Sequence, residues 1–122
     1  MTYKIDIKRG LKRTRKAYND QALAAQNGAP CRYSGDKGPC AVGAMLPKKV
    51  LSSIRAMGAN STDFLTLSGQ LDLIETATNT QRLDLQTLQN THDRWAQNPT
   101  PEREAAFETQ LSLMEQKYGV VA

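Results

Sequence analysis

Four residues in this sequence could together perform chemistry: Cys31, Cys40, His92, which is the only histidine, and the neighbouring Asp93. Two thiolates and an imidazole suit zinc, with a carboxylate or a water molecule in the fourth position. The same residues also suggest a thiol nucleophile, either Cys40 or Cys31, that His92 would activate and Asp93 would orient. Both interpretations describe a small zinc-dependent or cysteine-dependent enzyme.

The spacing of these residues favours a third interpretation. Eight residues separate Cys31 from Cys40, whereas zinc ribbons and thioredoxins carry cysteines only two residues apart. Neighbouring residues on a helix point about 100° apart, so Asp93 is poorly placed to orient His92. His92 instead continues a spacing typical of a buried helix face, set by Leu85, Leu88 and Trp95. We therefore expect a packed histidine, two buried cysteines and no cofactor, with zinc as the alternative.

Charge is divided unevenly along the chain. The formal net charge is +4, but residues 1–61 carry 12 Lys/Arg and 3 Asp/Glu, whereas residues 62–122 carry 4 Lys/Arg and 9 Asp/Glu. A basic half attracts phosphates or an acidic protein surface, and an acidic half on the same small body disfavours wrapping in nucleic acid. The two opposite charges would also allow copies of the chain to associate as a homo-oligomer.

The basic residues gather near the amino end of the chain. Seven of the first sixteen residues are Lys or Arg, and a helix there would form a basic stripe that also includes Lys8 and Arg15. Aromatic residues nearby are few, which disfavours a stacking platform for single-stranded nucleic acid. The predicted contact surface for a phosphate-bearing or acidic partner consists of six residues: Arg9, Lys12, Arg13, Lys16, Arg32 and Lys37.

Most elements that would position these residues are helices. Alternation of apolar and polar residues from Tyr3 to Ile7 predicts a short strand or a flexible arm within residues 1–10. Apolar spacing and breaker residues predict helices over residues 11–26, 47–57, 64–67, 71–96 and 101–118. Thr and Asn hold a helix interior poorly, so the long helix is expected to bend or break near residues 76–80. Thr100 would cap the last helix, with Pro101 at its first position.

A glycine-bounded turn at residues 35–38 lies between the first two helices. The flanking residues alternate as in a β-hairpin, which would place four side chains on one face: Cys31, Tyr33, Cys40 and Val42. The turn lacks the Gly-Lys-Ser/Thr ending of a phosphate-binding loop. We therefore predict a small β-hairpin or tight turn near residues 31–42, packed against the long helix.

Length and composition are those of a single domain, residues 1–122. The pattern as a whole predicts a mainly α fold, a compact bundle of about four to five helices with the small hairpin or turn. No run of about 18 apolar residues is present, so we expect no membrane span, no secretion and a cytoplasmic protein.

Two blocks of residues carry a resemblance to a known group of proteins. The first is Cys31-Arg32-Tyr33, the glycine turn, Cys40-Ala41-Val42-Gly43 and Leu46-Pro47, and the second is Leu88-Gln89 with His92-Asp93. Together they resemble a family of short proteins carried by bacteriophages and bacteria. Members of that family tend to have a cysteine in place of Ala44 and acidic residues in place of Lys48 and Lys49. The resemblance implies a phage or mobile-element setting and no particular activity.

The leading functional prediction is a non-enzymatic phage-type binding protein in the host cytoplasm. Its basic first half would engage a phosphate-bearing ligand or an acidic host protein and would block a host function such as an antiviral defence. Two alternatives stay open. One is the enzyme that uses Cys31, Cys40 and His92, and the other is a nucleic-acid-binding accessory protein.

Overall fold

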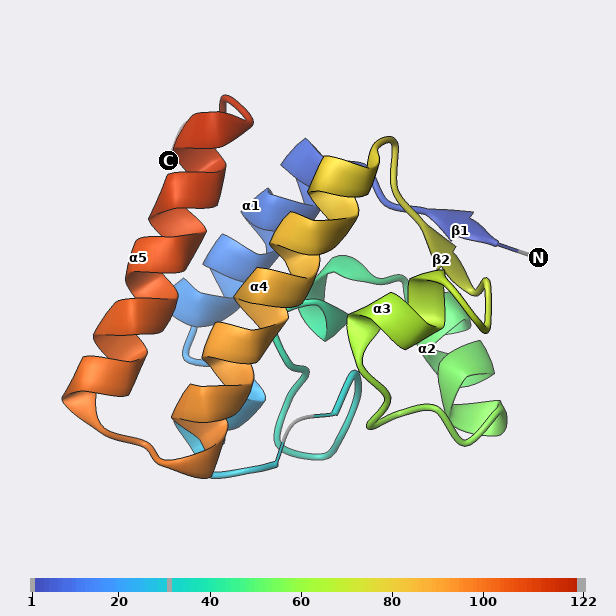
Figure 1. The fold of residues 1–122 in the computed structure, drawn as a ribbon. Helices are drawn as coiled ribbons and strands as arrows, with labels where there is room; N and C mark the ends of the chain where they lie inside the picture. The colour runs from blue at the N-terminus through green and yellow to red at the C-terminus, as the bar shows by residue number, and fades with distance from the viewer. Residues whose placement is uncertain (1, 31, 121–122) are drawn as a thin grey trace.

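The computed structural model describes residues 2–30 and 32–120, most of which are helical (Figure 1). Within them lie five α-helices: α1 (Ile7–Asn19), α2 (Lys48–Ala56), α3 (Phe64–Ser68), α4 (Asn79–Gln97) and α5 (Pro101–Lys117). Two short 3-10 helices, η1 (Ala24–Asn27) and η2 (Gly43–Met45), separate α1 from α2. Two-residue strands, β1 (Tyr3–Lys4) and β2 (Ile74–Glu75), precede α1 and α4. The prediction of a mainly helical bundle is confirmed.

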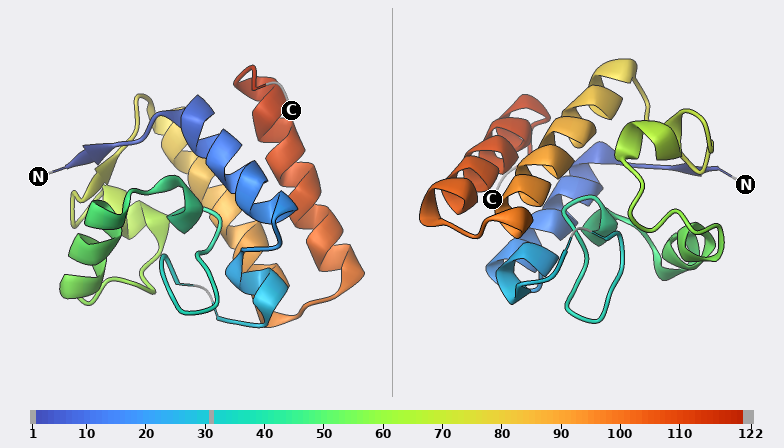
Figure 2. Two further views of the ribbon diagram at one scale, coloured as in Figure 1. Left: turned by 180° about the vertical axis from the view of Figure 1, so that it is seen from behind. Right: turned by 60° about the horizontal axis from the view of Figure 1, so that its bottom comes forward.

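The helices fall into two groups. The longest ones, α1, α4 and α5, run side by side, and α5 contacts both of the others (Figures 1 and 2). The second group consists of α2, α3 and the two strands, on the side of α4 away from α5 (Figure 1). The basic first helix and the last helix, which carries four Glu and two Lys/Arg, therefore share an interface.

Side-chain caps explain where four of the helices begin. Asp6, Asp63, Thr78 and Thr100 each accept a hydrogen bond, at 2.9–3.2 Å, from the backbone N–H three residues ahead. These caps satisfy N–H groups that have no partner inside the helix. The predicted cap Thr100, with Pro101 at the first position of α5, is confirmed.

The two strands form a parallel pair that local sequence did not predict. Tyr3 pairs with Ile74 and Lys4 with Glu75. The buried side chains of Ile5 and Ile7 follow β1 directly, so this end of the chain is anchored as a short strand and not as a free arm. Of the two alternatives for residues 1–10, a short strand or a flexible arm, the strand is the one observed, and its partner lies within the helix predicted over residues 71–96.

Residues 32–42 form a tight turn, and this segment contains no strand. The Gly38 N–H donates to the Gly35 carbonyl at 3.2 Å, and the Cys40 N–H donates to the Arg32 carbonyl at 2.9 Å. The other backbone groups bond elsewhere, since the Tyr33 N–H donates to the Asn60 carbonyl at 3.1 Å. The two sides of the turn therefore bond in part to other segments and do not form the repeated hydrogen bonds of a strand pair. The β-hairpin alternative is wrong.

Two predicted helices are longer than the observed ones. In place of 11–26, α1 begins at Ile7, because Asp6 caps it, and ends at Asn19, before the chain reverses at Gln21 with a φ of 56°. In place of 71–96, α4 begins only at Asn79, so of the bend or break expected near residues 76–80 the structure has a break. Residues 74–75 pair with β1, and Thr78 then caps α4.

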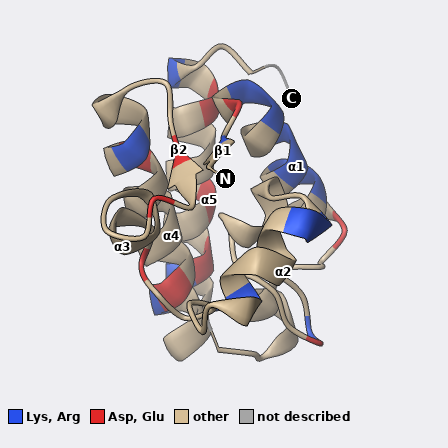
Figure 3. Cartoon of the chain, turned by 90° about the vertical axis from the view of Figure 1, so that its right-hand side faces the viewer, with Lys and Arg blue, Asp and Glu red and all other residues tan. Residues whose placement is uncertain are grey.

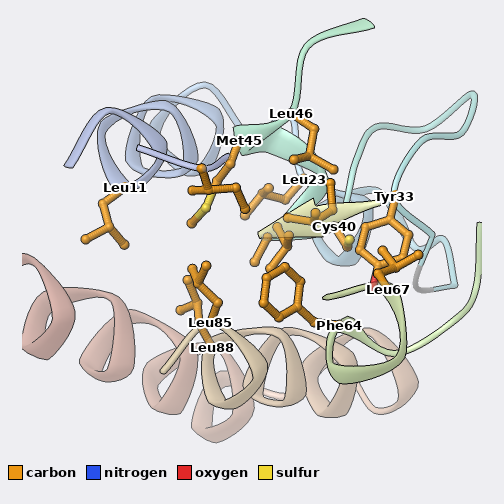
Figure 4. Close-up of a cluster of buried hydrophobic side chains, with 14 of the residues drawn as sticks. Leu11, Leu23, Tyr33, Cys40, Met45, Leu46, Phe64, Leu67, Leu85 and Leu88 are labelled. Carbon is orange, nitrogen blue, oxygen red and sulfur yellow. The ribbon is translucent and has the colours of Figure 1, made fainter. Parts of the chain in front are cut away.

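The core is one cluster of side chains drawn from every helix and from the turn. Figure 4 shows Leu11, Met45, Phe64, Leu85 and Leu88 converging between α1 and α4. Burial of this apolar surface is the main stabilising contribution to the fold. The apolar residues are distributed over all of these elements. In the described part of the chain, no helix is long and apolar enough to cross a membrane.

Candidate functional site

Cys40 lies in the core and is only 1% exposed. Its sulfur sits beside the ring of Tyr33, another buried residue of the turn (Figure 4). Burial raises the pKa of the Cys40 thiol to about 12, because a thiolate would lose its hydration there. A thiol in this state is a poor nucleophile at neutral pH. Cys31, its predicted partner, lies outside the described residues.

His92 is fully buried within the contact between α4 and its neighbours. Its Nε2 accepts a hydrogen bond from the Ala25 N–H of η1 at 3.4 Å, and its ring meets those of Trp95 and Phe107 edge-on at centroid distances of 6.1 and 5.9 Å. Its Nδ1 lies 3.6 Å from Oδ1 of Asp93, which is longer than a hydrogen bond. A packed histidine that bonds to the backbone is thus what the structure contains.

Asp93 is engaged by a residue that sequence reasoning missed. The buried Gln89 donates from Nε2 to Oδ1 of Asp93 at 2.6 Å and accepts from the Val42 N–H at 3.0 Å. A buried amide must satisfy both its donor and its acceptor, and this pair of bonds ties the turn to α4. The signal was available, since Gln89 lies one position from Leu88 and three from His92 on the buried side of the helix.

The structure brings some of the predicted metal ligands near one another without forming a site. No three His, Cys, Asp or Glu side chains within residues 2–30 and 32–120 are grouped to hold a metal ion. A cavity of about 70 Å³ does lie beside Cys40, and carboxylates of Asp63 and Asp93 line it together with Arg32. The zinc alternative depends on Cys31 and stays a prediction.

The burial of Cys40 gives the first testable prediction. In a Cys31→Ser variant, Cys40 is the only thiol, and we expect it to react with an aromatic disulfide reagent at pH 8 about a thousandfold more slowly in the native protein than in the urea-unfolded chain. The reason is that the raised pKa leaves about a thousandth of the usual thiolate. Absorbance of the released thiol measures both rates. Equal rates would contradict a core role for Cys40.

The predicted basic stripe forms an exposed surface on α1. Five cations of this helix are exposed, and Figure 3 shows Lys and Arg along α1 and further ones on α2. The Arg13 guanidinium also donates to the Met45 carbonyl at 3.4 Å, which links α1 to the segment that enters α2. We call this surface the basic face, and its members are Lys8, Arg9, Lys12, Arg13 and Lys16.

Arg15 does not belong to the basic face. It points to α5 and donates to both carboxylate oxygens of Glu115, at 2.6 and 3.1 Å, and to Glu108 at 3.4 Å. Its hydrogen bond to Glu115 raises the pKa of the guanidinium, against the effect of burial. Part of the opposite charge of the two halves is therefore neutralised within one chain and is not available for contacts between copies.

Arg32 and Lys37 are exposed on the turn, but their surroundings do not form a site that binds anions. The cavity at Arg32 is lined by Asp63 and Asp93, and the cavity at Lys37 is lined by Asp36. Carboxylates this close would repel a phosphate. Of the six residues predicted to bind an anionic partner, Arg9, Lys12, Arg13 and Lys16 share one surface, on which Lys16 pairs with the exposed Asp20 at 2.7 Å.

Comparison with protein-family models, curated proteins and solved structures finds no match for this chain, so the resemblance to phage-carried proteins stays a prediction.

Proposed function

We propose that this protein is a binding protein whose basic face docks on the phosphates of a phosphate-bearing polymer. The observation that carries the proposal is the composition of α1, which presents five exposed Lys/Arg and contains no Asp/Glu. Such a surface attracts a polyanion at long range and binds it by releasing counterions.

The form of the basic face favours an extended partner. Lys8, Lys12 and Lys16 repeat every four residues, as do Arg9 and Arg13, so the charges form two rows with steps of about 6 Å along the helix. They stand on the outside of a helix, where a polymer backbone can follow them. The acidic residues of α5 lie on the other side of α1, so contact would be made by one face alone.

The absence of apolar residues from this face favours phosphate over an acidic protein. The large hydrophobic side chains exposed in the described part of the chain are Met57, Leu83 and Leu113, none of which belongs to α1. Interfaces between proteins have an apolar centre, whereas contacts to phosphates need only charge and hydrogen-bond donors. The resemblance to phage-carried proteins sets this contact in an infected cell, where the partner would be a host component whose function is blocked.

The salt dependence of binding tests this proposal. We expect the chain to bind duplex DNA or RNA with a slope of log K against log salt of about −4.5, because five cations contact phosphates. The Arg9→Gln/Lys12→Gln variant should have a slope of about −2.7, because two contacts are lost. Fluorescence anisotropy of a labelled duplex over a salt series measures both slopes.

The matched control is Arg94→Gln/Arg103→Gln, which removes the same charge from exposed positions on α4 and α5. It should leave the slope unchanged. An equal loss in both variants would mean that net charge alone attracts the duplex. If the chain bound polyglutamate but neither duplex, the partner of the basic face would be an acidic protein and not a phosphate polymer.

A further inference from the structure

A cavity of about 220 Å³ lies between α2 and the turn at Ser34, away from every residue discussed as a catalytic candidate. It is lined by two cations, two hydroxyl groups and one apolar side chain: Ser34, Lys48, Leu51, Ser52 and Arg55. We call it the α2 pocket. Four other cavities of the described chain each include at least one Asp or Glu, whereas the α2 pocket includes none.

The sequence of α2 accounts for one wall of the α2 pocket. Lys48, Ser52 and Arg55 are spaced by four and then three residues, so they lie on one face of the helix. Leu51 lies beside them and supplies an apolar surface. The first turn of α2 carries Lys48 and Lys49 and no acidic residue.

The opposite wall is held in place by Asn60. Its side chain accepts from the Ser34 N–H at 3.1 Å and donates to the Ser34 carbonyl at 2.8 Å, so both backbone groups of Ser34 are fixed by one amide. The carbonyl of Asn60 also accepts from the Tyr33 N–H at 3.1 Å. The Ser34 hydroxyl is therefore presented to α2 by a backbone that is already ordered.

The donors of the α2 pocket have no partner in the part of the chain that the structure describes. Within residues 2–30 and 32–120, no hydrogen bond or ion pair engages the side chain of Lys48, Ser52 or Arg55. Two cations and two hydroxyls offer only N–H and O–H donors to an anion, and Arg can bind two oxygens of a phosphate at once.

We propose that the α2 pocket binds a phosphate group, in the form of a phosphomonoester. Lys48 and Arg55 would neutralise the dianion, the two hydroxyls would donate to its remaining oxygens, and Leu51 would contact the carbon skeleton that carries the phosphate. The volume is that of about seven water molecules, enough for a phosphate and the first atoms attached to it. This site does not depend on the basic face, so it holds or fails independently of the proposed function.

Titration with inorganic phosphate and with phenyl phosphate, followed by amide chemical shifts, tests this site. We expect saturable shifts centred on Ser34, Leu51 and Ser52, with tighter binding of phenyl phosphate because of Leu51. The Lys48→Gln/Arg55→Gln variant should bind at least about tenfold more weakly, since both charged contacts are lost. All substituted side chains are exposed, and the amide spectrum itself reports whether each variant is folded.

The matched control is Lys49→Gln, which removes the same charge from the next position of the helix but lies outside the α2 pocket. It should bind within about twofold of the original protein, because only distant attraction is lost. Three results would contradict binding at the α2 pocket. They are chemical shifts that stay linear with phosphate concentration, shifts confined to α1, or an equal loss of affinity in both variants. The Arg9→Gln/Lys12→Gln variant, which tests duplex binding, should leave the affinity for phenyl phosphate unchanged. This result separates the test of the α2 pocket from that of the basic face.

Discussion

A Gly43→Ala variant is expected to lose about 3 kcal/mol or more of its free energy of unfolding. Gly43 begins η2 in the buried core, and a Cβ there would overlap the Tyr33 carbonyl oxygen, with the carbonyl carbon and Cα at 2.8 and 2.9 Å. The obstructing atoms are backbone, so no side-chain rotation relieves the overlap. Either the turn or η2 must move, which disturbs Cys40 and Val42 in the core.

Urea unfolding followed by circular dichroism measures this loss. The control is Gly58→Ala, because Gly58 has a positive φ of 69° but no atoms within 4 Å of the added Cβ. Only backbone strain of about 1 kcal/mol applies there. Equal destabilisation by the two substitutions would show that the turn at Tyr33 does not pack on η2 as described.

Replacing Arg15 with methionine is expected to destabilise the protein by about 3 kcal/mol. The Arg15 side chain is 17% exposed and the Glu115 side chain 8% exposed, and the guanidinium also donates a hydrogen bond to the Ser112 hydroxyl at 3.2 Å. Without Arg15, the Glu115 carboxylate would remain between α1 and α5 with no cation beside it. Removing one partner of a buried pair costs more than the pair contributes, because the remaining charge keeps its desolvation cost.

The double variant Arg15→Met/Glu115→Met should therefore recover most of this stability, to within about 1 kcal/mol of the original protein. Thermal and urea unfolding of the two single variants and the double variant complete the cycle. The control is Lys16→Met, which breaks a pair with Asp20 on the exposed side of the same helix and should leave the unfolding midpoint unchanged. Additive losses at Arg15 and Glu115 would contradict the pairing.

Local signals predicted the helices whose ends are set by their own residues. Thr100 and Pro101 start α5, and the spacing of Phe107, Leu111 and Met114 matches its buried face. The burial of His92 also followed from its spacing on α4. These features depend on contacts within one helix turn, which a sequence pattern records directly.

Contacts between distant segments could not be predicted in this way. Nothing near Ile74 indicates that it pairs with Tyr3, so that segment was assigned to a helix. The alternation around the glycine turn predicted burial of Tyr33 and Cys40 correctly, but their backbone groups bond in part to other segments, as at Asn60. Register and partner choice depend on the whole fold, which the pattern of one segment does not contain.

In the candidate site, too, features set within one helix could be predicted, whereas contacts between distant segments could not. The exposed stripe on α1 followed from spacing, and the exception, Arg15, could have been recognised because it lies four residues after the buried Leu11 and one after the buried Thr14. The α2 pocket could not have been predicted, since it requires Ser34 and α2 to meet through Asn60.

The pairing of the first helix with the last one also sets the timing of folding during synthesis. Arg15 leaves the ribosome 100 residues before Glu115, which is about 5 to 20 s at ordinary translation rates. For that interval α1 lacks α5, and β1 lacks its partner until residue 74 is made. Chain closure over such separations slows folding, so the native bundle forms only once α5 has emerged, and the nascent chain carries an uncompensated cationic segment until then.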